Sequence, residues 1–155
     1  MNDISVDRAE AADVDFIVDS NRNMAAETED AGLDPNVLRA GIEYLMAHPD
    51  EGMYLVARQN GERVGTLMIT FEWSDWRNGR FWWIQSVYVP SRYRRRGVYR
   101  AMHEAVRQLA AGDPQICGLR LYVERDNRAA QQTYLDMGMA ETHYRLYEEA
   151  LGPAE

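Results

Sequence analysis

Five arginines surround one glycine in the segment 92–100, and residues of these types at this spacing could bind a phosphate group. The arginines are Arg92, Arg94, Arg95, Arg96 and Arg100, and the glycine is Gly97. A glycine lets the backbone approach a ligand closely, and the exposed amides at the beginning of a helix attract anions. Guanidinium groups add forked, charge-assisted hydrogen bonds to phosphate oxygens. We therefore expect a discrete phosphate-containing ligand at this turn.

The charge of the rest of the chain argues against a nucleic acid as that ligand. The 155 residues carry a net charge of -8, and the segment 92–100 contributes +5 without any acid, so the remainder carries -13. A polyanion would be repelled by such an acidic surface. The sequence thus favours a small anionic ligand and predicts no nucleic-acid partner.

Several other chemistries lack the residues that they require. All 17 basic residues are arginine, so the chain has no lysine for a Schiff base and no Gly-Lys-Ser/Thr phosphate loop. The spaced glycines of a dinucleotide site are also missing. The single cysteine, Cys117, is expected to be buried, and His48, His103 and His143 are scattered, so we expect no metal site.

The elements that must position the arginine turn begin with a strand and two helices. Residues 4–9 alternate like a short strand, and 11–28 have helical spacing of apolar residues. A second helix is expected to begin at Asp34, an N-cap residue followed by Pro35, and to end near 48–49.

Strands then dominate the middle of the chain. Three strand-like runs, 53–58, 64–73 and 80–89, are separated by turn-forming Asn-Gly pairs and predict an antiparallel meander. A helix after the arginine turn leads to a strand at 118–123, and a crossover through that helix would make this strand parallel to 80–89.

A helix at 127–137 and a strand at 139–147 are expected to complete the fold. The predicted class is α/β (α+β): a mixed, mostly antiparallel sheet with a central pair of parallel strands, flanked by helices. The ligand is expected at the carboxyl end of strand 80–89.

Length and composition predict one domain over residues 1–155. No apolar run approaches the ~20 residues that cross a bilayer, and the N-terminus is acidic, unlike a signal peptide. We expect no membrane partner and a cytoplasmic location.

Two motifs resemble the GNAT superfamily of N-acetyltransferases. The family signature Gln/Arg-x-x-Gly-x-Gly/Ala, between a strand and a helix, reads here from Arg94 to Tyr99. A second element, Asn-x-x-Ala-x-x-x-Tyr-x-x-x-Gly, matches Asn127, Ala130, Tyr134 and Gly138. The family's order of elements also matches the predicted order over essentially the whole chain.

The resemblance implies that acetyl-CoA is the cosubstrate and binds between the two parallel strands, which splay apart. The residues implied in binding it are Val87, Tyr88, Val89, Arg94, Arg95, Arg96, Gly97, Val98, Tyr99, Asn127, Ala130 and Tyr134. Tyr134 also resembles the family's general acid, which protonates the departing thiolate. Tyr99 replaces a small residue of the signature, so its ring must turn aside from the pyrophosphate.

The general base is not assigned by the resemblance. Many family members have a glutamate where this chain has Gln85, which cannot take a proton. The candidate bases are Glu72 on the preceding strand and Glu27 or Glu29 on the first helix; a proton relay through water or a neutral incoming amine are the alternatives.

The acceptor is expected to be the primary amine of a small, cationic molecule. Glu27 and Glu29 lie where the family covers its acceptor, and Trp73 and Asp75 lie on the neighbouring hairpin beside Gln85. Carboxylates and aromatic ring faces both suit a cation. The tryptophans could instead pack on the core or on a second copy in a homodimer. Two other functions remain open: acetylation of a protein N-terminus or lysine, and acyl-CoA sensing without catalysis.

Overall fold

The computed structural model describes residues 3–28 and 32–152. Its chain separates into two compact units, Met1–Tyr122 and Val123–Glu155. The second unit contains one helix, α4 (Arg128–Asp136). Each unit is described by itself.

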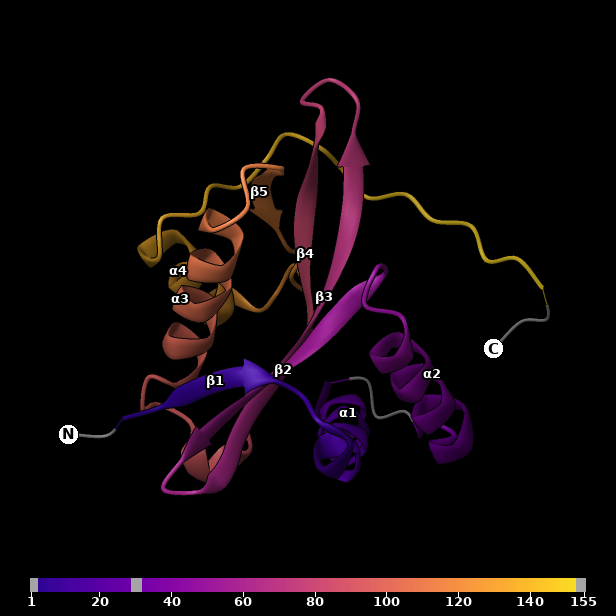
Figure 1. The fold of residues 1–155 in the computed structure, drawn as a ribbon, viewed down its shortest axis with the longest axis vertical. Helices are drawn as coiled ribbons and strands as arrows, with labels where there is room; N and C mark the ends of the chain where they lie inside the picture. Colours follow the sequence, from indigo (N-terminus) through magenta and orange to yellow (C-terminus); the bar gives the residue numbers. More distant parts are fainter. Residues whose placement is uncertain (1–2, 29–31, 153–155) are drawn as a thin grey trace. The chain divides into compact units, whose positions relative to one another are not determined.

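A mixed sheet forms the centre of the first unit (Figure 1). In the described residues its strands are β1 (Ser5–Arg8), β2 (Gly52–Gln59), β3 (Glu62–Ser74), β4 (Gly79–Tyr88) and β5 (Ile116–Arg120), in that spatial order. The first four strands are antiparallel neighbours, and β4 and β5 are parallel. The predicted meander and the parallel pair are thus confirmed.

Helices cover the two faces of this sheet. The short helix η1 (Ala11–Asp13) leads into α1 (Val14–Thr28), which packs with α2 (Pro35–Ala47) on one face. The other face packs against α3 (Val98–Ala111), which follows the short helix η2 (Ser91–Tyr93). Figure 1 shows α3 on the opposite side of the sheet from α1 and α2.

Local sequence signals explain where these elements begin. Asp34 caps α2, because its Oδ1 accepts a hydrogen bond from the amide of Asn36 at 2.9 Å, and Pro35 occupies the first helical position. The turn residues Asn60 and Asn78 have φ of 53° and 48°, the left-handed conformation expected for hairpin turns.

The α3 face of the sheet holds the larger hydrophobic core. Leu55, Leu67 and Ile69 from the strands pack against Met102 and Val106 of α3, and all are at most 1% exposed. Burial of such side chains contributes roughly 1.5–3 kcal/mol each. This core holds the beginning of α3, and with it the arginine turn, at the end of β4.

Two expectations about individual segments were wrong. Residues 139–147 form no strand, because a strand needs a hydrogen-bonded neighbour and the described part of the second unit contains no other strand. Cys117 is exposed rather than buried, since it lies near the beginning of the edge strand β5.

Candidate active site

The arginine turn ends in an uncapped helix N-terminus. Gly97 is the N-cap of α3 with φ of 81°, and no side chain caps the helix. The first helical bond runs from the amide of Ala101 to the carbonyl of Gly97, so the preceding amides of the first turn are not used within the helix. A β-carbon added at Gly97 would meet no atom within 4 Å. The turn therefore places amides that make no helical hydrogen bond beside open space, as an anion site requires.

The five arginines of the turn have different partners. Arg92 and Arg96 lie over the ring of Tyr93, at 4.8 and 5.9 Å from its centroid. In the described part of the chain, Arg95 and Arg100 have no acidic partner, and both are exposed. These two guanidinium groups are the ones available to a phosphate ligand.

Arg94 instead ties α1 to the end of β4. Its Nε donates to the carbonyl of Val89 at 2.7 Å, and its terminal nitrogen donates to Glu27 Oε1 at 2.7 Å. The Tyr88 hydroxyl donates to the other oxygen of Glu27. These bonds from Tyr88 and Arg94 lower the pKa of Glu27, whereas burial and the bond to Glu27 raise the pKa of Tyr88. Glu27, a predicted base and acceptor-binding residue, thus connects α1 with the end of β4 and the arginine turn.

A bulge deforms β4 two positions before its end. Thr66 pairs with Tyr88 and Met68 pairs with Gln85, so Ser86 and Val87 stand opposite the single residue Leu67. Ser86 has φ of 52°, a left-handed conformation that is uncommon for residues other than glycine. The bulge reorients the last residues of β4, including the Val87 and Tyr88 positions predicted to bind the cosubstrate.

The parallel strands separate just before this bulge. The last register pair of β4 and β5 is Trp83 with Arg120, while β4 continues to Tyr88. Among the described residues, no strand pairs with the β5-side edge of β4 beyond Trp83. This unpaired edge gives an extended ligand backbone donors and acceptors to pair with.

A polar and aromatic cluster lies on the α1/α2 face of the sheet at this separation point. Glu72 Oε1 accepts hydrogen bonds from the indole of Trp83 and from a terminal nitrogen of Arg120, both at 2.9 Å. Two residues further along β4, the side-chain amide of Gln85 donates to Thr70 Oγ1 at 2.5 Å. Glu72, the predicted base, and Gln85 therefore share one face, since every second residue of a strand points the same way.

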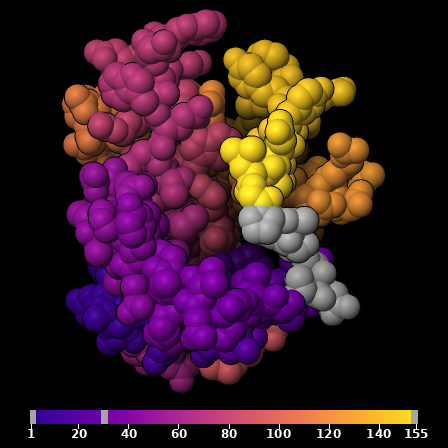
Figure 2. Space-filling model, turned by 90° about the vertical axis from the view of Figure 1, so that its right-hand side faces the viewer, coloured from indigo at the N-terminus to yellow at the C-terminus, as the bar shows by residue number. Residues whose placement is uncertain are grey.

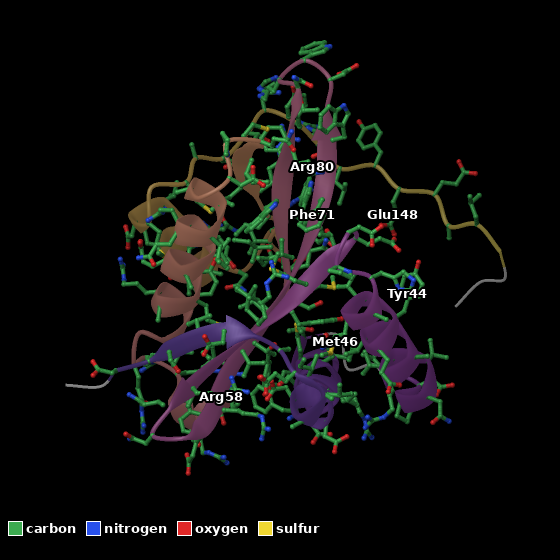
Figure 3. All side chains as sticks on the ribbon, in the orientation of Figure 1. Tyr44, Met46, Arg58, Phe71, Arg80 and Glu148 are labelled. Carbon is green, nitrogen blue, oxygen red and sulfur yellow. The ribbon has the colours of Figure 1, made fainter. Side chains whose placement is uncertain are left out.

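The hairpin residues Trp73 and Asp75 do not join that cluster. Trp73 directly follows Glu72 along the strand and pairs in register with Arg80, whose guanidinium lies 5.5 Å from the Trp73 ring. This pair therefore occupies the opposite, α3 face of the sheet. Asp75 lies in the turn, where its carbonyl accepts from the amide of Asn78. Figure 3 shows Arg80 on the upper hairpin and Phe71 closer to the core.

Tyr99 contacts His103 one helical turn further along α3. The Tyr99 hydroxyl lies 3.0 Å from His103 Nδ1, and the two rings meet edge to face. The Tyr99 ring is therefore directed along the flank of α3. His103 is fully buried, and burial followed by the charge of Arg107 lowers its pKa.

The second motif lies on α4 in the second unit. Asn127 is the N-cap of α4, and its Oδ1 accepts a hydrogen bond from the amide of Ala130 at 3.1 Å. Ala130 and Tyr134 follow at helical spacing, so the three residues share one side of α4. Burial raises the pKa of Tyr134, which keeps its phenol protonated at neutral pH.

The sequence interpretation missed Trp83, Thr70 and Arg120. Strand periodicity places Trp83 on the same face of its strand as Gln85, so the alternation of side chains could have found it. No local signal identifies Arg120, which lies 48 positions from Glu72 along the chain. Glu29, the remaining predicted acceptor residue, lies outside the described residues.

The described ranges 3–28 and 32–152 lack two further features. They contain no group of three His, Cys, Asp or Glu side chains that could hold a metal ion. None of their helices combines the length and apolar character needed to cross a membrane.

Comparison with known proteins identifies the family. The model of the acetyltransferase (GNAT) family matches residues 18–139. A solved structure described as a possible acetyltransferase from Clostridium difficile 630 is 40% identical, covers 97% of this chain and 99% of its own, and has a TM-score of 0.89. No curated protein sequence matched the chain.

Two more distant structures share the fold. One is a predicted acetyltransferase from Clostridium acetobutylicum solved with acetyl-CoA, at 17% identity, 95% and 96% coverage and a TM-score of 0.76. The other is an aminoglycoside N-acetyltransferase in complex with CoA, at 13% identity, 97% and 96% coverage and a TM-score of 0.76. The mixed sheet with its parallel pair, the arginine turn and the family match agree: this chain belongs to the GNAT acetyltransferase family.

Proposed function

We propose that this protein transfers the acetyl group of acetyl-CoA to the primary amine of a small acceptor, by direct attack in a ternary complex. The observation that carries the proposal is the uncapped N-terminus of α3, where Gly97 faces open space and lies between Arg95 and Arg100, which have no acidic partner among the described residues. The structures of two distant family members with acetyl-CoA or CoA support the same ligand.

The arginine turn fits a pyrophosphate. The amides of Val98 and Tyr99 at the first turn of α3 would donate to its oxygens, and Arg95 and Arg100 would add charge. The Tyr99 ring does not oppose this, since its hydroxyl is held by His103 while its amide remains at the turn. Arg94 would act indirectly, by fixing the turn against α1.

The unpaired edge of β4 fits the pantetheine arm. Backbone groups near Val87 and Val89 would pair with its amides, in the way that an added strand pairs with an open edge. An amide of the bulge could also donate to the thioester carbonyl, and such a donor contributes roughly 3 kcal/mol to lowering the barrier. We propose that Asn127 and Ala130 of the second unit complete this binding, so that residues 1–155 work as one catalytic domain.

Two residues of the chain would act as the general acid and the general base. The amine attacks the thioester carbon, and the tetrahedral intermediate collapses as the carbon–sulfur bond breaks and Tyr134 donates its phenolic proton to the sulfur. Glu72 is the proposed base: one of its oxygens is occupied by Trp83 and Arg120, while the other has no partner among the described residues. The carbonyl oxygen of Gln85 would accept a hydrogen bond from the amine.

Thiol release tests the proposal. The protein is mixed with acetyl-CoA and a panel of small primary amines and peptides, and free CoA is titrated as it appears. Binding of acetyl-CoA is measured separately by calorimetric titration. We expect saturable release with some of these amines and little without an acceptor. Release only with peptides would move the function to protein acetylation. Binding of acetyl-CoA without release from any acceptor would favour the sensor and would overturn catalysis.

A further inference from the structure

The Arg120 cluster, which we define as Glu72, Phe81, Trp83 and Arg120, holds a guanidinium group in a fixed position. Its carbon lies 3.6 Å from the centroid of the Phe81 ring, so the planar group stacks on that ring. A terminal nitrogen of the same group donates to Glu72 Oε1. Arginine held by both a ring and a hydrogen bond is preorganised and loses little freedom when it binds a further ligand.

Most donors of Arg120 are not used by the protein. A guanidinium group has five N–H bonds in a planar fork, and the described residues accept only the one that points to Glu72. The side chain is 24% exposed, and Glu72 is 44% exposed, so the cluster is accessible from the α1/α2 face of the sheet. A carboxylate is the group that matches the remaining fork.

The charges of the cluster favour a ligand that carries an anionic group as well as a cationic one. Glu72 and Arg120 neutralise each other, so a second cation placed beside Glu72 would also be placed beside the Arg120 charge and repelled by it. In a molecule that carries both an ammonium group and a carboxylate, each charged group can lie beside a residue of opposite charge. The amine could approach Glu72 while the carboxylate pairs with Arg120.

The position of Arg120 connects it with the reaction. Its partner Trp83 forms the last register pair between β4 and β5, and Gln85 lies about 7 Å further along β4 on the same face. The arginine turn begins α3 on the opposite face, so the proposed cosubstrate reaches the strand separation from one side and the acceptor from the other. Figure 2 shows the β3–β4 hairpin in magenta rising above the violet α1–α2 region on this side of the first unit.

We propose that Arg120 binds a carboxylate of the acceptor, so that the acceptor class is a small molecule with both a primary amine and a carboxylate. This inference rests on the proposed acetyl transfer to an amine. It narrows the acceptor and gives Arg120 a role in specificity.

Matched acceptor pairs test the inference. β-Alanine, 4-aminobutyrate and 6-aminohexanoate are each compared with the alkylamine of the same length, and leucine is compared with 3-methylbutylamine. In the wild-type protein we expect kcat/KM to be at least 10-fold higher for the carboxylate member of at least one pair. The chain length of the best carboxylate acceptor also indicates how far the reacting amine lies from Arg120.

The variant Arg120→Gln should reduce that preference to less than 3-fold. The preference is the ratio of the two kcat/KM values within a pair, so a general change in activity through Glu72, which Arg120 also contacts, cancels out. Arg80→Gln is the matched control, because Arg80 is on the neighbouring strand but faces the other side of the sheet. Arg120→Lys keeps the positive charge but lacks the planar guanidinium group, so it should retain part of the preference. This variant provides the test if Arg120→Gln does not fold. Thermal unfolding of each variant identifies such a loss of structure.

The outcomes separate the two proposals. If the wild-type protein acetylates both members of every pair equally, or if Arg120→Gln and Arg120→Lys keep the full preference, the Arg120 inference is wrong and acetyl transfer stands. If neither series is acetylated although acetyl-CoA binds, the proposed transfer to small amines is wrong, and the Arg120 inference fails with it.

Discussion

At the scale of single residues, Tyr134 and Asp13 illustrate two different environments of a polar group. Tyr134 is partly buried, and burial raises the pKa of its phenol, so the hydroxyl carries its proton at neutral pH. Asp13 is completely buried but charged, and Arg58 and Arg63 both bind its Oδ1, at 2.5 and 2.7 Å. In our proposal Tyr134 donates a proton in catalysis, whereas Asp13 fixes the beginning of α1 to the sheet.

Replacing Tyr134 by Phe should lower kcat by about 100-fold, because the thiolate would leave without a proton donor. The Kd for CoA should change less than 2-fold, since only the hydroxyl is removed. Steady-state kinetics and calorimetric titration measure the two effects. Tyr147→Phe, at a tyrosine that is 87% exposed on the same unit, serves as the control. Equal losses of turnover and CoA affinity would remove the acid assignment.

Replacing Asp13 by Asn should destabilise the protein by about 3 kcal/mol, because two arginines would lose their buried partner. Urea denaturation measures the free energy of unfolding. Asp15→Asn is the control: Asp15 pairs with Arg39 on the surface and is 82% exposed, so its loss should cost less than about 1 kcal/mol. Similar losses in the two variants would show that the buried pairs contribute little.

At the scale of elements, the site depends on how β4 ends and α3 begins. The bulge at Ser86 and the separation from β5 free one edge of β4, and the turn that follows presents the first amides of α3. Arg94 fixes this turn to α1 through Glu27, so the elements on both faces of the sheet meet at the predicted cosubstrate site.

Replacing Gly97 by Ala should weaken acetyl-CoA binding by about 10-fold, because the added β-carbon would occupy the open space at the turn. It should also cost about 1–2 kcal/mol of stability, since φ of 81° is unfavourable for alanine. Gly61→Ala is a close control. Gly61 has φ of 78° and also faces open space, but it lies in the β2–β3 turn. Both variants should lose similar stability, and a similar loss of affinity in both would contradict a specific role of Gly97.

At the scale of the whole molecule, the buried charges and rings make stability depend on pH. Burial raises the pKa of Asp13, but hydrogen bonds from the Glu10 amide, Arg63 and Arg58 outweigh it and lower the pKa below its usual 3.8. The resulting stabilisation is present above that value and is lost as the pH falls through the lower folded-state pKa. His103 affects the stability at higher pH than Asp13 does, since burial lowers the pKa of its imidazole from 6.5.

The free energy of unfolding should therefore decrease as the pH falls below about 6.5. The unfolded chain takes up a proton at His103 there, while the buried ring stays neutral until the lower folded-state pKa is reached. One such group changes the free energy of unfolding by at most about 1.4 kcal/mol per pH unit. Urea denaturation between pH 7.5 and 5 measures the slope. In His103→Gln the slope should be clearly smaller; an unchanged slope would show that His103 does not cause it.

The sequence by itself determined the features that depend on neighbouring residues. Pro35 and Asp34 mark the beginning of a helix, Asn-Gly pairs mark the hairpins, and Gly97 marks the uncapped start of α3, because each effect acts over a few backbone bonds. The order of strands also followed, since short turns leave few ways to connect them.

Only the tertiary structure decided which charges meet. Arg94 reaches Glu27 over 67 positions and Arg120 reaches Glu72 over 48, so two carboxylates that seemed available to a cationic acceptor already have partners. The strand expected at 139–147 likewise required a neighbour that periodicity cannot supply. Side-chain pairing depends on the register and the separation of strands, and these are set by packing over the whole sheet rather than by the local sequence.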